Sequence, residues 1–125
     1  MENSKMENFA AQAIPSEMKT VRIGIEPFIA LHNARGCVLV DVRVGYETAV
    51  WGVNIGLKIP ADEIADRLDE LPRDKTIVLA CPNSDRSNIV RSYLAAQGFD
   101  AKYLNGGLLG LTAYLKGGDA KKLEL

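Results

Sequence analysis

The chain has 125 residues, 47% of them hydrophobic and 25% charged, which suffices for one hydrophobic core and is short for two. With 15 basic and 16 acidic residues, its net charge of -1 excludes binding to nucleic acid or an anionic membrane that is driven by overall charge. There is no membrane-length apolar run, no signal-peptide core and no disulfide framework, so we expect a cytoplasmic protein with free thiols.

The first part of the chain predicts a lead-in, an edge strand and a helix. Residues 1–18 are polar and weakly patterned, so we expect a flexible N-terminal lead-in. Residues 19–23 alternate as in a short edge strand, and residues 25–33 place Pro27 in the first turn of a helix. His32 has no sequence neighbour that would make it a metal ligand or a general base, so we expect a surface histidine.

A second apolar run, C-V-L-V-D-V over residues 37–42, is typical of a central strand in a parallel sheet. Cys37 begins this strand and is expected to be a small core residue. Asp41 and Arg43 carry charge where the strand leaves the core. They can pair with each other, cap a short helix over residues 46–50, or face the loop of a neighbouring strand. A structural role is favoured, because a buried charge needs a partner.

Two further elements are expected to cover the sheet. Within residues 51–59 the sequence predicts a small strand, because the apolar residues Val53, Ile55, Leu57 and Ile59 alternate with other residues. Residues 61–71 predict a helix that Pro72 ends. The apolar residues at helical spacing are Ile64, Leu68 and Leu71.

The stretch from Thr76 to Gly98 predicts a strand, a tight loop and a helix. Residues 76–80 are β-branched or apolar, as in a buried strand, and Pro82 prevents its continuation beyond Cys81. The helix beginning near Ser87 has an apolar stripe and a polar side. The stripe comprises Ile89, Val90, Tyr93 and Leu94, and the polar side comprises Arg91, Ser92 and Gln97.

Both ends of this helix carry recognisable signals. The candidate N-caps are Ser84, Asp85 and Ser87. Gly98 fits the left-handed position that closes a helix, and Phe99 is expected to fold back onto Leu94.

Cys81 is the residue on which a chemical function would depend. It follows the strand over residues 76–80 at its carboxyl end, where open α/β sheets place their sites. Inward-pointing loop amides, the end of the following helix and Arg86 all favour the thiolate, which is the reactive form. Cys37 lies at the amino end of its own strand, so the two thiols are not expected to act together.

The last part of the chain completes an alternation of strands and helices. Residues 101–104 predict a strand, residues 105–107 a turn with left-handed glycines, and residues 108–115 a helix. We expect a three-layer α/β/α sandwich with a mainly parallel central sheet, formed by one domain over residues 19–116. Residues 117–125 predict a polar, frayed C-terminal tail.

Four segments in the right order resemble one known family. Cys81 followed by four residues and then Arg86-Ser87 resembles the active loop of a rhodanese-like domain. The other segments are Asp41-Val42-Arg43 with Glu47, similar to D-x-R-x-x-x-E, Ile59-Pro60, similar to I-P, and Leu104-Asn105-Gly106-Gly107, similar to L-x-G-G. The resemblance spans residues 21–111.

Rhodanese-like domains are largely sulfurtransferases, and the resemblance implies that chemistry here. Cys81 would take a sulfane sulfur from a small donor, namely thiosulfate, a polysulfide or a persulfide. It would hold that sulfur as a persulfide and pass it to a thiophilic acceptor, which can be a protein thiol. No metal or organic cofactor is required. The substrate cradle would comprise Pro82, Asn83, Ser84, Asp85, Arg86 and Ser87, and Asp41 and Arg43 would support the loop.

The loop departs from relatives that use thiosulfate, which tend to resemble C-R-x-G-x-R-S where this chain has C-P-N-S-D-R-S. Pro82 removes one amide from the cradle and Asp85 adds a negative charge, so both oppose a dianionic donor. If Asp85 instead caps the helix and points outward, the electrostatic cost shrinks. Arg86 either braces the loop or contacts substrate, and bracing is favoured. A histidine found in relatives before the I-P segment is replaced by Gly52.

Two other functions are compared with sulfur transfer. Phosphatases place five residues between cysteine and arginine, whereas this loop has four, so its ring of amides is too narrow for phosphate. The alternative is a non-catalytic rhodanese-like module that binds a protein or senses redox state. Pro82, Asp85 and Gly52 favour that alternative, and the retention of Cys81 opposes it. The partner protein and the oligomeric state are left open.

Overall fold

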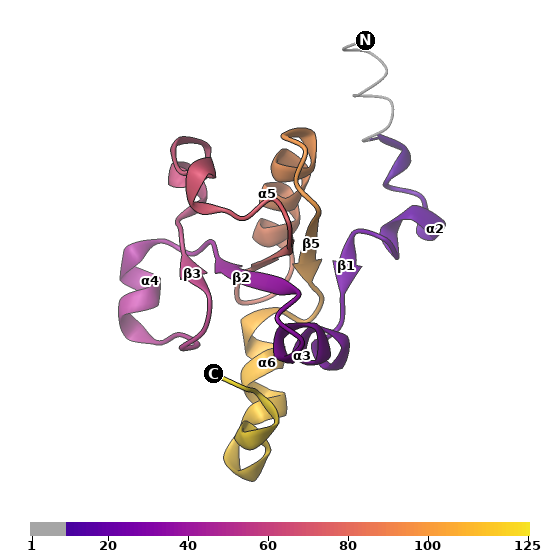
Figure 1. The fold of residues 1–125 in the computed structure, drawn as a ribbon. Coiled ribbons are helices and arrows are strands. Elements are labelled where there is room, and N and C mark those ends of the chain that lie inside the picture. The colour runs from indigo at the N-terminus through magenta and orange to yellow at the C-terminus, as the bar shows by residue number, and fades with distance from the viewer. Residues whose placement is uncertain (1–9) are drawn as a thin grey trace.

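A five-stranded sheet with the order β1-β5-β4-β2-β3 forms the centre of the computed structural model, which describes residues 10–125 (Figure 1). The strands are β1 Arg22–Ile23, β2 Cys37–Asp41, β3 Leu57–Lys58, β4 Thr76–Ala80 and β5 Ala101–Leu104. Every pairing between them is parallel. The predicted parallel sheet is confirmed, and the long central strands carry almost uninterrupted apolar runs because both faces are covered.

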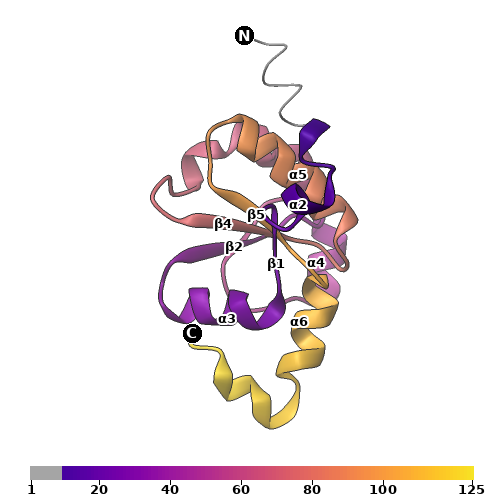
Figure 2. The same cartoon turned by 90° about the vertical axis from the view of Figure 1, so that its right-hand side faces the viewer.

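Helices cover both faces of this sheet (Figure 2). On one side lie α3 Ile25–Asn33 and α6 Gly107–Leu115, whose buried residues pack against Leu39 and Val78. On the other side lie α5 Asp85–Ala96 and the 3-10 helix η1 Ala61–Asp66, which pack against Val40 and Leu79. The three-layer sandwich is therefore confirmed.

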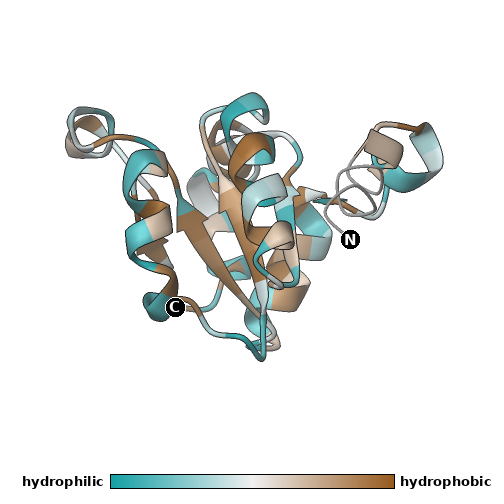
Figure 3. Cartoon of the chain, turned by 90° about the horizontal axis from the view of Figure 1, so that it is seen from above, coloured by the Kyte–Doolittle hydropathy of each residue, from teal (hydrophilic) through white to brown (hydrophobic). Residues whose placement is uncertain are grey.

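Successive side chains of a strand point to opposite faces of the sheet, so both layers of helices pack against apolar residues. Ile77 and Leu79 of β4 belong to the cluster under α5, whereas Val78 and Ala80 belong to the cluster under α3 and α6. Burial of each large side chain contributes about 1.5–3 kcal/mol. Figure 3 shows hydrophobic strands in the centre of the molecule and helices whose outer surfaces are largely hydrophilic.

The register of the sheet sets the position of the Cys81 loop. Cys37 pairs with Thr76 at the amino end of β2 and β4, and Asp41 pairs with Ala80 at their carboxyl end. The chain segments that leave β2 and β4 therefore emerge at the same edge. Helix α4, Gly45–Val50, follows β2 at that edge.

The segment before η1 differs from its prediction. Only Leu57–Lys58 forms a strand, whereas a longer strand was predicted within residues 51–59. Gly56 has a φ of +74°, and a Cβ there would collide with the carbonyl of Leu39. The alternating pattern is interrupted by this close approach, which only glycine permits.

The predicted helix over residues 61–71 is also wrong in type. The structure has two 3-10 helices, η1 and η2 Leu68–Glu70, separated at Arg67, whose φ of -126° is not helical. Arg67 forms salt bridges with Glu63 and Glu70. Ile64 and Leu71 are nonetheless buried as their spacing predicts.

Helix α5 begins at Asp85, and its buried face matches the predicted stripe only in part, because Val90 and Leu94 are buried as predicted. Ile89 is 72% exposed and Arg91 only 4% exposed, the reverse of the expectation. The buried face comprises Ser87, Val90, Arg91 and Leu94. The Arg91 guanidinium donates to Asn88, Ser92 and Gln12. At the other end, Gly98 has a φ of +90° and the Phe99 amide bonds to the carbonyl of Leu94, as predicted.

The C-terminal residues contact the domain, and part of the N-terminal lead-in is helical. Residues 1–9 of the predicted lead-in lie outside the described residues, and α2 Pro15–Met18 follows. The expected fraying after residue 116 is wrong, because η3 Gly117–Lys122 forms and the last residues bond to α3. Asn33 donates to the Lys122 carbonyl at 2.9 Å, and the Glu124 carbonyl lies 2.6 Å from His32 Nε2.

Among residues 10–125, no helix combines the length and apolarity needed to cross a membrane.

Candidate functional site

Cys81 directly follows β4, and the first turn of α6 holds its backbone in place. The Cys81 carbonyl accepts a hydrogen bond from the Leu108 amide at 2.8 Å, and the Pro82 carbonyl accepts one from Leu109 at 3.2 Å. The start of a helix has unpaired amides, so these two bonds satisfy both the helix end and the loop. The loop is thereby tied to α6.

Gly107 makes this close packing possible. Its φ is +63°, and a Cβ at this position would collide with the carbonyl oxygens of Pro82 and Asn83. The neighbouring Gly106 has a φ of +93°, and its amide donates to Ser84 Oγ at 3.4 Å. The sequence identified the left-handed turn, but the contact between Gly107 and the loop is long-range and carries no local signal.

The Cys81 sulfur has polar neighbours on the loop side. The Ser87 amide donates to Sγ at 3.4 Å, and Ser87 Oγ lies 3.5 Å from Sγ. Ser87 Oγ in turn donates to the Ser84 carbonyl at 3.1 Å. Cys81 itself is 0% exposed and belongs to the apolar cluster beneath α5. The thiol is therefore enclosed, and a main-chain donor points at its sulfur.

Asp85 faces the thiol instead of capping α5. Its Oδ1 lies 3.9 Å from Cys81 Sγ, within reach of the thiol proton. Ser84 is the N-cap residue, and no side chain caps the helix. The sequence left the orientation of the Asp85 side chain open. In the structure its carboxylate points towards the Cys81 sulfur.

Arg86 braces the loop through an ion pair with Glu47 of α4. The two bonds, Nη1 to Oε1 and Nη2 to Oε2, measure 2.8 and 2.9 Å. Glu47 Oε1 also accepts from the Val44 amide at 3.2 Å. The hydrogen bonds from Arg86 are the main reason that the pKa of Glu47 falls to about 2, and they raise the pKa of Arg86. Glu47 is therefore the residue against which Arg86 braces the loop. In the sequence, only its place in the D-x-R-x-x-x-E segment singled it out.

Asp41 and Arg43 form a buried pair with each other. Arg43 Nη2 lies 2.8 Å from Asp41 Oδ2, and Arg43 Nε contacts both carboxylate oxygens. Arg43 also donates to the Trp51 carbonyl at 2.9 Å, and its guanidinium lies 4.2 Å from the centre of the Trp51 ring. This network fixes the connection from β2 to α4, as the structural alternative predicts.

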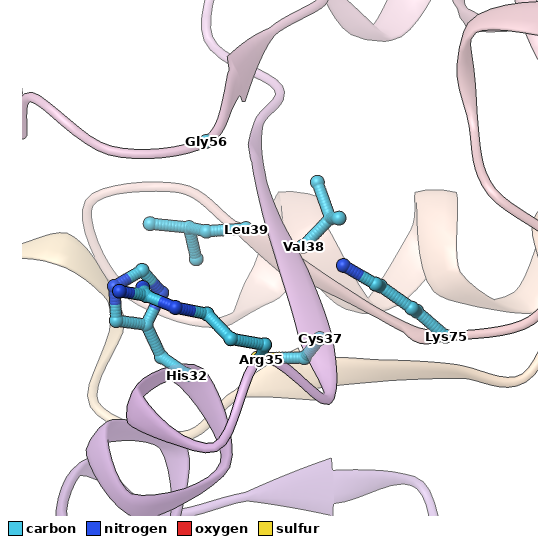
Figure 4. A pocket seen from close by; sticks show the side chains of 7 residues that line it. All are labelled: His32, Arg35, Cys37, Val38, Leu39, Gly56 and Lys75. Carbon is cyan, nitrogen blue, oxygen red and sulfur yellow. The ribbon is translucent and has the colours of Figure 1, made fainter. Parts of the chain in front are cut away.

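Cys37 lies in a different part of the molecule. It lines a small pocket at the amino end of β2, together with His32, Arg35 and Lys75 (Figure 4). Burial raises the pKa of its thiol to about 11, although Lys75 acts in the opposite direction. Cys37 is a protonated core residue, and the two thiols are at opposite ends of the sheet, as predicted. Residues 10–125 contain no cluster of side chains suited to hold a metal ion.

Comparisons with known proteins identify relatives of this chain. A sulfurtransferase from Allochromatium vinosum is 31% identical over 80 residues, covering 63% of this chain and 75% of that protein. A Bacillus subtilis protein, provisionally named a sulfurtransferase, is 32% identical over 71 residues, 57% of this chain and 69% of that protein. The solved structure of a rhodanese-like domain protein from Staphylococcus aureus superposes with a TM-score of 0.66 at 28% identity, covering 72% of this chain and 89% of that one.

The named relatives support a sulfurtransferase-type function, with a sulfur donor and an acceptor as substrates in general terms. The family model for the rhodanese-like domain matches residues 26–114, which is most of the chain. The chain belongs to the rhodanese-like domain family.

Proposed function

We propose that this protein moves a sulfane sulfur from a donor to a thiophilic acceptor through a persulfide on Cys81. The observation that carries the proposal is the enclosed Sγ at the end of β4, with the Ser87 amide 3.4 Å away. A main-chain donor at this distance from Sγ stabilises the Cys81 thiolate. Ser87 Oγ, 3.5 Å from Sγ, accepts from the neutral thiol, because its own proton is donated to the Ser84 carbonyl.

The reaction consists of two displacements at sulfur. The Cys81 thiolate attacks the outer sulfur of the donor, so that a new S–S bond forms and the donor's S–S bond breaks with its electron pair on the departing group. The acceptor thiolate then attacks the terminal sulfur, and Cys81 leaves as a thiolate. The sulfane sulfur keeps its oxidation state throughout. Neither step needs an oxidant, a reductant, a metal or an organic cofactor.

The charges around the sulfur favour a donor with one negative charge, such as an alkyl persulfide, over a dianion such as thiosulfate. Asp85 places a carboxylate 3.9 Å from Sγ, and the positive charge of Arg86 is compensated by Glu47. A dianion entering the loop would meet the Asp85 charge without a free cation from Arg86. Asp85 is exposed, and its movement away from Sγ would open the loop to a less charged donor.

Intact-mass measurement tests the proposal directly. Purified protein is incubated with polysulfide or with thiosulfate and weighed before and after treatment with cyanide. We expect a cyanide-labile gain of one sulfur from polysulfide, its absence in Cys81→Ala and its retention in Cys37→Ala. An adduct that survives in Cys81→Ala would contradict the assignment of the nucleophile.

The complete burial of Cys81 favours a second candidate, a non-catalytic module that binds a protein or senses redox state. A thiol with no exposed surface reacts only when its surroundings move. If no donor produces an adduct in the wild type, sulfur transfer is contradicted and the binding module becomes the better assignment.

A further inference from the structure

Large hydrophobic side chains are exposed around the Cys81 loop. Six such side chains are exposed in residues 10–125, and four of them lie on the helices that contact this loop. These four are Tyr46 at 79% and Val50 at 80% on α4, Ile89 at 72% on α5, and Leu109 at 49% on α6. We call these four residues the apolar rim. Clusters of exposed apolar residues of this kind mark interaction sites.

Each part of the apolar rim is connected to the loop by a specific contact. The Glu47–Arg86 ion pair joins α4 to the first turn of α5. Ile89 is one helical turn after Asp85, so both side chains lie on the same face of α5. The Leu109 amide bonds to the Pro82 carbonyl. The four residues of the rim therefore lie on the three helices that contact the Cys81 loop.

An apolar groove extends the rim between α5 and η1. Its volume is about 250 Å³, and it is lined by Ala61, Ile64, Ala65, Ile89, Val90 and Tyr93. Burial of a large aliphatic side chain is favourable, and Ile89 is 72% exposed in the free protein. A partner that inserts an apolar side chain here would cover both Ile89 and the groove.

The charged residues beside the groove indicate which charge the partner's surface would carry. Three segments form this face, namely α4, η1 with Arg67, and the first turn of α5. Together they carry more acidic than basic residues. They contain five carboxylates, Glu47, Asp62, Glu63, Asp66 and Asp85, and two arginines, Arg67 and Arg86. Within the described residues, Asp62, Asp66 and Asp85 form no salt bridge, and both arginines are paired with carboxylates. A basic partner would be complementary to this face.

We propose that the apolar rim and groove dock a protein whose acceptor cysteine is flanked by apolar and basic side chains. This inference rests on the proposed sulfur transfer and names its acceptor. The partner's thiolate attacks the terminal sulfur of the Cys81 persulfide, a new S–S bond forms on the partner, and the bond to Cys81 Sγ breaks to leave a thiolate. Small anionic thiols lack the apolar contacts and are repelled by the carboxylates.

Three synthetic peptides with blocked ends test the docking surface. They are K-L-C-L-K, the acidic E-L-C-L-E and the polar K-S-C-S-K. The protein is loaded with sulfur from polysulfide, and the single-turnover rate of transfer to each peptide is followed by mass. We expect transfer to K-L-C-L-K to be at least about 10-fold faster than to the others, which corresponds to about 1.4 kcal/mol.

Two matched variants locate the surface. Ile89→Ser is expected to reduce transfer to K-L-C-L-K to about the rate for K-S-C-S-K. The control, Ile14→Ser, removes another exposed isoleucine, 52% exposed and outside the groove, and is expected to leave that rate unchanged. Equal rates for the three peptides, or equal effects of the two variants, would overturn the docking surface while the proposed sulfur transfer stands.

A binding measurement separates the two proposals if loading fails. Fluorescence anisotropy with labelled K-L-S-L-K, which has no thiol, reports docking without chemistry. Tighter binding than for the acidic and polar analogues, lost in Ile89→Ser, supports the surface, and equal binding overturns it. Concentration-dependent dimerisation of the protein that Ile89→Ser abolishes would assign the surface to a second copy of this chain and would also overturn the proposal.

Discussion

Replacing Asp85 by asparagine should shift donor preference towards thiosulfate. The carboxylate lies 3.9 Å from the sulfur that receives the donor. Two unit charges about 4 Å apart interact by about 1 kcal/mol in water and about 4 kcal/mol at an effective dielectric constant of about 20. Because Asp85 is exposed, its effect lies towards the lower value. Since thiosulfate is a dianion, we expect a barrier lowered by about 1–3 kcal/mol, or about 5- to 150-fold in kcat/KM.

The assay compares two donors with cyanide as the common acceptor. Sulfite release reports thiosulfate turnover, and thiocyanate formed above the uncatalysed rate reports turnover of an alkyl persulfide that carries one negative charge. The measured quantity is the ratio of the two kcat/KM values, because it cancels errors in the active protein concentration. Asp85→Glu keeps the charge and should keep the wild-type ratio. Asp69→Asn removes an exposed carboxylate of η2 and should also leave the ratio unchanged.

An unchanged ratio in Asp85→Asn would refute the electrostatic account of donor selection. Equal losses with both donors would instead indicate that the carboxylate positions the Cys81 thiol through its hydrogen bond. A gain with thiosulfate that Asp69→Asn reproduces would point to net charge and would also contradict a local role for Asp85.

Three further predictions concern the support of the loop and the second thiol. The pKa of Glu47 lies near 2, below its ordinary value of 4.5, so the pair with Arg86 stabilises the fold above about pH 4.5 and loses that effect as the pH falls towards 2. In Glu47→Gln, denaturant midpoints should therefore depend less on pH in this window. Gly117→Ala, with a φ of +65° and open space around the site, should cost about 1 kcal/mol in a denaturation curve. Gly107→Ala should cost more and abolish the Cys81 persulfide, because its Cβ meets loop carbonyls; equal costs would contradict that contact. Cys37, with a pKa of about 11, should resist iodoacetamide at pH 8 until the protein unfolds, and rapid alkylation of the folded protein would contradict its burial.

The main strands and the first helix could be predicted from local patterns. Residues 76–80 and 101–104 were predicted with the bounds that the structure shows for β4 and β5, and residues 25–33 match α3. Each has a clear apolar run or a proline or glycine boundary, and its neighbours in the sheet reinforce the local preference. The position of Cys81 followed from the same signals, because strand order and the parallel direction place loop ends at one edge.

The features that the sequence did not reveal depend on contacts between distant segments. Arg91 is buried, whereas its charge predicts exposure, because Asn88, Ser92 and Gln12 satisfy its guanidinium. The partner of Arg86 is Glu47, which lies 39 positions earlier in the chain. The direction of the Asp85 carboxylate has no periodic or capping signature at all. Side-chain pairing of this kind requires the folded geometry.

The contacts around the loop restrict how a buried thiol can be reached. The carbonyls of Cys81 and Pro82 are bonded to α6, the Ser84 hydroxyl accepts from Gly106, and Arg86 is tied to Glu47. Opening the whole loop would break all of these contacts together, whereas rotating the exposed Asp85 side chain breaks only its contact with Sγ. We therefore expect access to Sγ to depend on the Asp85 side chain, which also carries a charge. A single substitution at position 85 can consequently change both entry and donor preference while the backbone of the loop stays in place.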